Sequence, residues 1–309
     1  MAKLHVRVPA TTANLGPGFD ALGLALDLWN EAEFARRTDG RVVVAVTGEG
    51  MGVLPTDEHN LIAASALRVF ELAGERPPGL QIDCHNNIPL ASGLGSSAAA
   101  VLSGMLAANA LLDERFDQEA LLKIAIQAEG HPDNVAPAML GGLVVCLVDG
   151  ERVRLHPLAP RADRGSIYIT LVLPECDFPT QAARAVLPAQ VDCQDAIFNI
   201  SRAVLVVEAL RSGDMGLLGS AMEDRLHQPY RLPLIPGAQA ALDAAKGAGA
   251  AAVALSGAGP SLAAFSAHRD PAIGEEMQAA FAAEGISARA FVLSPSDAGT
   301  EIEWVAGSS

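Results

Sequence analysis

The chain has 309 residues, of which half are apolar and 18% are charged, a balance typical of a water-soluble globular protein. Its length allows one large domain or two ordinary domains that share a cleft. The formal net charge is -15 at pH 7 and only three lysines occur, so the chain has no cationic face for a nucleic acid or an anionic membrane, and both are excluded as partners.

The cysteines and the N-terminal residues indicate the compartment. The four cysteines show no CxxC pair and no metal-ligand spacing, which favours structural thiols. The N-terminal residues alternate as in a strand and lack the apolar block of a signal peptide. No apolar run reaches the roughly 18 residues that span a membrane. We therefore expect a cytoplasmic protein.

The first half of the chain predicts strands and helices in alternation. Alternating or β-branched runs predict strands over 6–8, 24–34, 41–46, 80–84 and 142–148, with the first strand broken by Pro9. Apolar residues at helical spacing predict helices over 60–73, from a loop at 93–97 to about 112, and over 117–129. The residues from His131 to Asn134 are expected to form a loop.

The second half repeats this mixture after a loop around 157–165. Strands are predicted over 167–173, 251–255, 263–267 and 288–293, and helices over 193–211, 215–225, 238–247 and 273–284. We interpret the chain as α+β in two lobes, with an N-terminal domain at 1–160 and a C-terminal domain at 161–309.

A glycine-serine loop is the strongest motif in the sequence. It runs Pro89-Leu90-Ala91-Ser92-Gly93-Leu94-Gly95-Ser96-Ser97-Ala98-Ala99 and leads into a predicted helix. Glycines let the backbone turn sharply and approach a ligand. The following helix presents free N–H groups and the positive end of its dipole at the same point. Such a corner is suited to a nucleotide phosphate.

The loop is not the common P-loop, because residues 77–104 contain no lysine and Ala98 stands where a GxGxxG fingerprint has its third glycine. Phosphate charge must then be met by backbone N–H groups, the helix dipole and a metal ion. Ser97 offers a hydroxyl to Mg²⁺, and Glu129 is the candidate carboxylate. The alternative is that the segment merely turns and that Ser96 or Ser97 caps the helix.

A second glycine loop follows a predicted strand late in the chain. It reads Ser256-Gly257-Ala258-Gly259-Pro260-Ser261. Two interpretations stand. The segment is a tight turn, or it closes over the phosphates from the other lobe.

Three separated blocks together resemble the GHMP kinases. They are residues 9–26, which include Ala-Asn-Leu-Gly-Pro-Gly-Phe-Asp at 13–20, the glycine-serine loop, and the second glycine loop. The last two are shared across the superfamily. The first block is similar to that of homoserine kinases, whereas mevalonate-type members and galactokinases carry a Gly-Glu-His run there. The stretches 180–188 and 227–237 resemble homoserine kinases as well.

The resemblance implies a GHMP kinase two-lobe fold, often dimeric. Its N-terminal lobe would be ribosomal protein S5 domain 2-like, with a left-handed βαβ unit, and its C-terminal lobe ferredoxin-like. The implied activity is ATP-dependent phosphorylation of the side-chain hydroxyl of L-homoserine, a step of threonine biosynthesis. ATP would lie on the loop from Pro89 to Ala99 with Asn60 near the adenine, and Ser97 and Glu129 would hold Mg²⁺. L-Homoserine would be bound by Asn14, Asp20, Thr180, Arg184 and Arg231.

The residues suit a zwitterionic acceptor. Asp20 offers a carboxylate for the ammonium group, and Arg184 and Arg231 offer planar forks for the carboxylate. Mevalonate has no ammonium group, so Asp20 would have no partner on it. The alternative is that Asp20 caps a turn after Gly18 and that both arginines are solvated surface residues.

The proton of the acceptor hydroxyl is the hardest question. Other superfamily members use an aspartate near Asp133 as the base, whereas homoserine kinases place an asparagine near the hydroxyl, here Asn134. An amide cannot take a proton but can orient the hydroxyl, and phosphoryl transfer asks mainly for positioning and charge neutralisation. Our hypothesis is positioning by Asn134 and Asn14 with no dedicated base. We interpret His131 as structural, because a lone loop histidine has no visible partner.

Three other functions compete with this one. A GHMP-type kinase for another hydroxyl, such as mevalonate or a sugar, would share both glycine loops but not the first block. A catalytically silent GHMP-like binding protein would bind nucleotide without turnover. A nucleotide-free α+β binding module would leave both glycine loops as coincidental turns.

Overall fold

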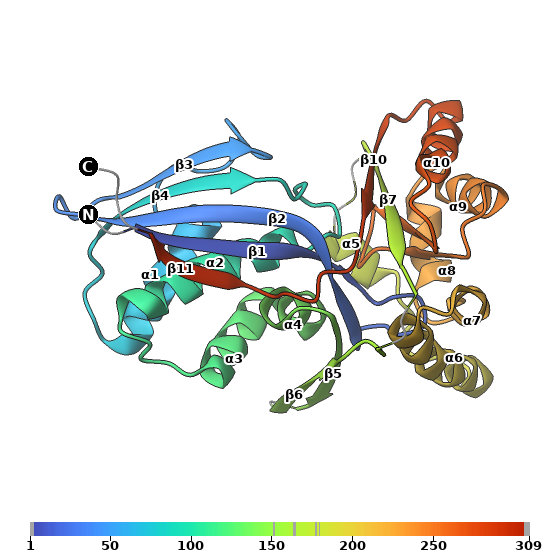
Figure 1. Ribbon diagram of the computed structural model, residues 1–309, viewed down its shortest axis with the longest axis horizontal. Coiled ribbons are helices and arrows are strands. Elements are labelled where there is room, and N and C mark those ends of the chain that lie inside the picture. The colour runs from blue at the N-terminus through green and yellow to red at the C-terminus, as the bar shows by residue number, and fades with distance from the viewer. Residues whose placement is uncertain (1–2, 151, 163–164, 177, 179, 306–309) are drawn as a thin grey trace.

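Two β-sheets divide the molecule into two lobes that lie side by side (Figure 1). The computed structural model describes residues 3–150, 152–162, 165–176, 178 and 180–305, without the side chains of residues 180 and 181. We name the lobes N-terminal and C-terminal after the part of the chain that forms most of each.

The larger sheet has seven strands and forms the N-terminal lobe. Its main path is β11-β1-β2-β4-β3, and β5 pairs with both β2 and β6. The strands are β1 Lys3–Ala13, β2 Leu22–Arg37, β3 Val42–Gly48, β4 Gly79–Asn86, β5 Leu143–Asp149, β6 Arg152–Leu158 and β11 Glu301–Val305. β3 and β4 are parallel, and the connection through α1 supplies the crossover that a parallel pair needs, whereas β1 and β4 each pair antiparallel with β2.

The first strand continues past Pro9, so the predicted break there is wrong. β1 reaches Ala13, and its register with β2 shifts between Pro9 and Ala10. Proline has no N–H for the ladder, and the irregularity accommodates it without ending the strand. The continuation brings the next loop to the C-terminal lobe, where Asn199 donates a hydrogen bond to the carbonyl oxygen of Pro17.

Helices α1–α4 lie together on one side of the larger sheet (Figure 1). They are α1 Leu61–Ala73, α2 Ser96–Leu111, α3 Gln118–Glu129 and α4 Pro132–Leu140. The first three confirm predicted helices, and Asn60 and Asp117 cap α1 and α3 through their side chains. α4 stands where a loop was expected after His131. Pro132 is tolerated because it occupies the first helical position, where no N–H is needed.

A four-stranded antiparallel sheet of order β10-β7-β9-β8 forms the C-terminal lobe. The strands are β7 Tyr168–Pro174, β8 Ala252–Leu255, β9 Leu262–Ser266 and β10 Ala288–Leu293. The helices are α5 Thr180–Ala185, α6 Cys193–Ser212, α7 Met215–Ala221, α8 Gln228–Arg231 with a 3₁₀ turn at Leu232–Leu234, α9 Ala238–Gly247 and α10 Pro271–Ala283. These strands and α6, α9 and α10 confirm predicted elements, while α7 ends earlier than predicted. Over the described ranges, no helix is long and apolar enough to cross a membrane.

The last described strand returns to the N-terminal lobe. β11 pairs antiparallel with β1, from Lys3 opposite Val305 to Arg7 opposite Glu301. The division of the chain into 1–160 and 161–309 stays a prediction. In the structure the segment at 301–305 completes the sheet of the first lobe although it belongs to the second predicted range.

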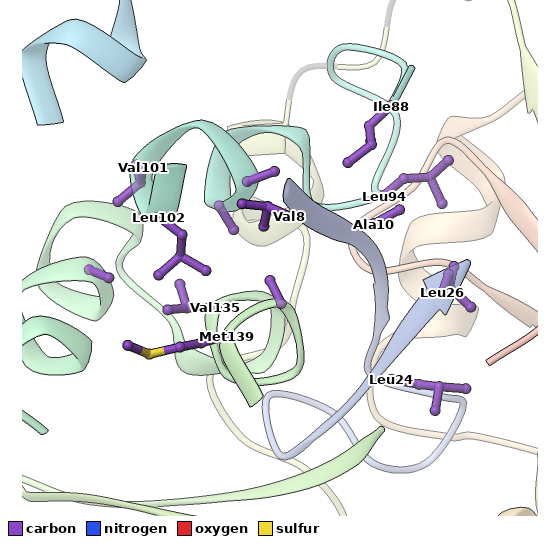
Figure 2. Packing of buried hydrophobic residues seen from close by; sticks show 14 of the residues in the cluster. Val8, Ala10, Leu24, Leu26, Ile88, Leu94, Val101, Leu102, Val135 and Met139 are labelled. Carbon is purple, nitrogen blue, oxygen red and sulfur yellow. The ribbon is translucent and has the colours of Figure 1, made fainter. Parts of the chain in front are cut away.

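An apolar core between the larger sheet and its helices anchors the site (Figure 2). Leu102 of α2 and Val135 of α4 are fully buried in it, and so is Leu94 of the glycine-serine loop. A separate cluster that includes Met277 and Phe281 fixes α10 to the smaller sheet. Burying one such side chain stabilises the fold by roughly 1.5–3 kcal/mol. The glycine-serine loop is therefore held rigidly by its own leucine.

Candidate active site

The glycine-serine loop ends at the start of a helix that no serine caps. α2 begins at Ser96, and Gly95 is its N-cap residue. The hydroxyl of Ser97 donates to Glu129 Oε1 at 2.5 Å. The capping alternative is therefore wrong. The first turn of α2, with its free N–H groups, instead lines a polar cavity.

The two glycine loops pack against each other across the lobes. Ser256 Oγ donates to the carbonyl oxygen of Gly93 at 3.0 Å. Gly93 and Gly95 have φ values of 78° and 73°, and a Cβ atom there would lie 2.4 Å from the carbonyl oxygen of Ser256 and 2.1 Å from Thr11 Oγ1, respectively. Both positions require glycine for conformation and for space. The second glycine loop also lines the polar cavity, so it is more than an isolated turn.

Ser97 and Glu129 place two hard oxygen ligands beside the helix N-terminus. Glu129 is the last residue of α3 and is half-buried at the cavity wall. In the part of the chain that the structure describes, no group of three or more His, Cys, Asp or Glu side chains could hold a metal ion. Mg²⁺ takes one or two protein oxygens and completes its shell with phosphates and water. The donor pair therefore fits the metal predicted from the sequence.

An apolar cavity of about 230 Å³ borders the first turn of α2. Asn60 lies in its wall, where Nδ2 donates to the carbonyl oxygen of Pro55 at 2.7 Å and Oδ1 accepts from the N–H of Ile62 at 3.2 Å. Apolar side chains make up much of the remaining wall: Val46, Leu54, Leu61, Leu90 and Ala100. A cavity with this lining suits a flat, largely apolar group such as a purine base.

The polar cavity, of about 340 Å³, adjoins the apolar one. The two share Ala91, Ser96 and Ser97 as wall residues, so they meet at the first turn of α2. Titratable and amide side chains from both lobes line the polar cavity: Asn14, Asp20, Glu129, His131, Asp133, Asn134, Arg184 and Arg231. The structure therefore brings together all but a few of the predicted site residues around two joined cavities.

Asp20 and Arg184 form an ion pair in the wall of the polar cavity. Arg184 Nη2 donates to Asp20 Oδ1 at 3.0 Å, and the two side chains are 55% and 37% exposed, respectively. The backbone of Asp20 has a φ of 54°, and its N–H donates to Asn14 Oδ1 at 2.9 Å. The Asp20 carboxylate thus faces a cation and the cavity, and it is not a turn cap.

Arg231 is a buried cation in the same wall, not a solvated surface residue. Its side chain is among the largest fully buried ones of the chain, with 2% exposure. Nε donates to the carbonyl oxygen of Ala183 at 2.9 Å, and the guanidinium carbon lies 5.0 Å from the ring centroid of Phe19. Burial lowers the pKa of Arg231. The surface alternative is therefore wrong for this arginine.

Two asparagines line the polar cavity. Asn14 Nδ2 donates to the carbonyl oxygen of Gly257 at 2.8 Å, and its Oδ1 accepts from Asp20, so Asn14 ties the first block to the second glycine loop. Asn134 Oδ1 accepts from Thr11 Oγ1 at 2.8 Å. Since its oxygen is engaged by Thr11, the amide nitrogen is the group that Asn134 offers to the cavity.

His131 has a partner, which corrects the premise that this histidine stands alone, while its structural role stays a prediction. Its Nδ1 lies 2.7 Å from Asp133 Oδ1, and the Asp133 side chain is 4% exposed. This hydrogen bond is the main cause that raises the pKa of His131. His131 is the N-cap residue of α4 and not part of a loop, and the start of the helix turns Asp133 back toward it.

Comparison with known proteins identifies the family. The descriptions "GHMP kinases N terminal domain" and "GHMP kinases C terminal" match residues 60–142 and 206–286. A homoserine kinase from Moorella thermoacetica is 45% identical over 298 residues, which cover 96% of this chain and 99% of that protein. The chain belongs to the homoserine kinases of the GHMP kinase family.

Further relatives support the fold of this GHMP kinase. A homoserine kinase from Synechococcus is 41% identical over 302 residues, which cover 97% of this chain and 98% of the relative. The crystal structure of homoserine kinase from Cytophaga hutchinsonii matches with a TM-score of 0.85 and 33% identity over 97% of both chains. The two-lobe GHMP kinase fold predicted from the sequence is confirmed.

Only part of the predicted ATP loop of this GHMP kinase exposes side chains to the cavities. Ser92 lines the polar cavity, although its hydroxyl donates to the carbonyl oxygen of Pro89 at 2.8 Å. Leu94, Ala98 and Ala99 are fully buried, so only their backbone could reach a nucleotide. The side chain of Thr180, predicted to bind the acceptor, lies outside the described residues.

Some supporting residues of this GHMP kinase were missed by sequence reasoning. Thr11 holds Asn134, and Phe19 and His227 lie against Arg231. The stretch 227–237 carried part of the resemblance, but its residues received no role besides Arg231. A predicted helix at 228–231 would have placed His227 and Arg231 one turn apart and pointed to their contact.

Proposed function

We propose that this GHMP kinase transfers the γ-phosphoryl group of ATP to the side-chain hydroxyl of L-homoserine. One observation carries the proposal. The polar cavity is lined by the first turn of helix α2, by one carboxylate with two arginines, and by an asparagine amide. These groups together are complementary to a triphosphate and to a zwitterionic amino acid.

The two cavities give ATP a consistent orientation. The base would occupy the apolar cavity near Asn60, and the phosphates would follow the glycine-serine loop into the polar cavity. Family membership supports ATP as the donor, because GHMP kinases use ATP. Ser97 and Glu129 would hold Mg²⁺, which neutralises phosphate charge when bound. The backbone N–H groups of the loop would neutralise the rest, as no lysine is available there.

The acceptor end would select by charge. Asp20 would bind the ammonium group, and Arg184 and Arg231 the carboxylate, with Thr180 as a further contact. Asn134 would donate from its amide to the acceptor oxygen and so direct its lone pair to the γ-phosphorus atom. A bond forms between that oxygen and phosphorus, the bond to the β-phosphate oxygen breaks, and the hydroxyl proton leaves to solvent or to a phosphate oxygen.

The transfer would need no side-chain base. Asp133 is the candidate base that lines the polar cavity next to Asn134, but its carboxylate is buried and hydrogen-bonded to His131. The substitution Asp133→Asn should therefore keep kcat within about threefold of the wild-type value, because positioning dominates phosphoryl transfer. Steady-state kinetics check this, and a loss of several orders of magnitude in kcat would overturn it.

An acceptor panel tests the proposal. ADP release is measured with Mg-ATP and L-homoserine, L-serine, L-threonine, mevalonate or galactose. Turnover with homoserine well above the others supports the assignment of Asp20, Arg184 and Arg231 to the zwitterion. Turnover only with mevalonate or a sugar keeps a kinase but sinks that assignment. ATP binding without any turnover would favour a catalytically silent protein.

We extend the proposal to the cellular compartment and the oligomeric state of the protein. We place the reaction in the cytoplasm, a reducing compartment in which the four free cysteines would stay reduced. We also propose a homodimer, which size-exclusion chromatography with light scattering would test. A monomeric mass at micromolar protein concentration would refute the proposed homodimer.

A further inference from the structure

Arg231 belongs to a buried polar cluster. The other members are Asp224 and His227, and the ring of Phe19 packs against the cluster. The side chains of Asp224 and His227 have no exposure to solvent. Asp224 Oδ2 accepts from the N–H groups of His227 and Gln228 at 2.9 and 2.6 Å, which fixes the start of α8. His227 and Arg231 therefore lie one helical turn apart on a fixed frame.

The contacts of the His227 ring define which nitrogen carries its proton. Nε2 lies 2.8 Å from the carbonyl oxygen of Gly16, which can only accept, so Nε2 is the donor. Burial lowers the pKa of His227, which favours the neutral ring. Nδ1 then holds a lone pair, and it lies 3.4 Å from Arg231 Nη1, which can only donate.

Phe19 completes the support of the guanidinium. Its ring stacks on His227 with centroids 5.0 Å apart and an angle of 22° between planes. The guanidinium carbon of Arg231 lies 5.0 Å from the same ring centroid. A cation over an aromatic face is attracted by the ring quadrupole. The aromatic ring and the imidazole thus restrict the guanidinium from two sides.

These contacts divide the five N–H groups of Arg231. Nε is held by the carbonyl oxygen of Ala183, and one N–H of Nη1 is held by His227. Among the described residues no partner is seen for the other N–H of Nη1 or for the two of Nη2, and Arg231 lies in the wall of the polar cavity, where these groups can meet a ligand. Two parallel N–H groups of a guanidinium match a carboxylate in a bidentate manner, and less conformational freedom is lost on binding when the plane of the fork is already fixed.

We propose that His227 is a positioning residue that fixes the guanidinium plane of Arg231 and thereby sets the affinity for the carboxylate of the acceptor. This inference rests on the proposed function. It assigns His227 no contact with substrate and no proton transfer. Its two ring nitrogens have separate tasks: Nε2 anchors the loop after β1 through Gly16, and Nδ1 orients Arg231.

Two substitutions separate these tasks. His227→Gln can keep a donor for Gly16 but places no acceptor at the Nδ1 position, whereas His227→Asn keeps an acceptor near Nδ1 and loses the donor to Gly16. A hydrogen bond to a charged group contributes about 1.5–3 kcal/mol, so we expect His227→Gln to raise the KM for homoserine about tenfold or more. His227→Asn should restore it to within about threefold of wild type, with kcat and the KM for ATP nearly unchanged in both.

The decisive control is an acceptor without a carboxylate. 3-Aminopropan-1-ol is homoserine without that group, so its kcat/KM should be the same in wild type and in His227→Gln, which can keep the donor to Gly16. An equal loss of kcat/KM for both acceptors would overturn the inference, because it would mean general damage to the site. Equal behaviour of the Gln and Asn variants, with Tm near wild type, would overturn it as well.

A further variant covers the case in which the His227 variants do not fold. Phe19→Leu removes the aromatic face under the guanidinium and should also raise the KM for homoserine while sparing 3-aminopropan-1-ol. Loss for both acceptors alike would again contradict the inference. Failure of the proposed function has a different signature, since the wild-type enzyme itself would then not turn over homoserine.

Discussion

Replacing Asp20 with asparagine removes one negative charge from the acceptor end of the polar cavity and keeps the local backbone. Asparagine tolerates the left-handed φ of 54°, and the N–H of residue 20 can still donate to Asn14 Oδ1. Asp20 faces Arg184 at 3.0 Å in the structure. In the proposed complex it faces the ammonium group of the acceptor, so the substitution tests recognition of that group.

The size of the effect follows from Coulomb's law. Two unit charges about 4 Å apart attract by about 4 kcal/mol at an effective dielectric constant of about 20. The Asp20 side chain is 37% exposed, so solvent screening reduces this to about 2 kcal/mol. That energy corresponds to a loss of about 30-fold in kcat/KM for L-homoserine.

4-Hydroxybutyrate, which is homoserine without the ammonium group, is the matched acceptor for this assay. For the wild-type enzyme it should be a poor acceptor, because binding would leave Asp20 beside an anion without a counter-charge. Asp20→Asn should lower kcat/KM for homoserine and leave that for 4-hydroxybutyrate unchanged or higher. If kcat/KM fell equally for both acceptors, the role of Asp20 would be to support the wall of the polar cavity and not to recognise the ammonium group.

Three further outcomes are expected. Glu129→Gln should lower kcat by roughly 100-fold and raise the Mg²⁺ concentration for half-maximal rate, whereas Glu119→Gln on the same helix should change neither. Gly95→Ala should lower the free energy of unfolding in urea by about 2–4 kcal/mol, while Gly52→Ala, with a φ of 75° and nothing within 4 Å of the added Cβ, should cost only about 1 kcal/mol. The pKa of His227 is lowered in the folded protein, so wild-type stability is full above the unfolded pKa of about 6.5 and falls as pH decreases toward the folded pKa, by up to about 1.4 kcal/mol per pH unit. His227→Asn should lack that part of the pH dependence in melts from pH 7.5 to 5, and identical profiles would contradict the burial argument.

Local signals in the sequence were sufficient for most of the fold. Helix 238–247 and strand 288–293 coincide with α9 and β10, because apolar periodicity marks both directly. α4 was not predicted, because His-Pro-Asp-Asn resembles a turn. Tertiary contacts of its apolar residues stabilise the helix there. β11 was not predicted, because its strand character depends on pairing with β1, which lies at the other end of the chain.

The site divides in the same way. Residues inside motifs, such as Ser97 and Asp20, could be predicted, because their chemistry is written in the motif itself. The residues that support these side chains from behind could not be predicted. Thr11 acts on Asn134, and His227 on Arg231, through contacts that only the folded chain creates. The pair of Asp133 with His131 was missed although the residues are neighbours, because a helix start was not expected between them.

The most direct test of the central claim is the fate of the γ-phosphoryl group. ATP labelled with ¹⁸O at the non-bridging γ-oxygens is incubated with the wild-type protein, Mg²⁺ and L-homoserine. The masses of the products are then measured by mass spectrometry. We expect O-phosphohomoserine that carries all the label, with an unlabelled ester oxygen from the homoserine hydroxyl. Label recovered only in inorganic phosphate, with homoserine unchanged, would contradict it.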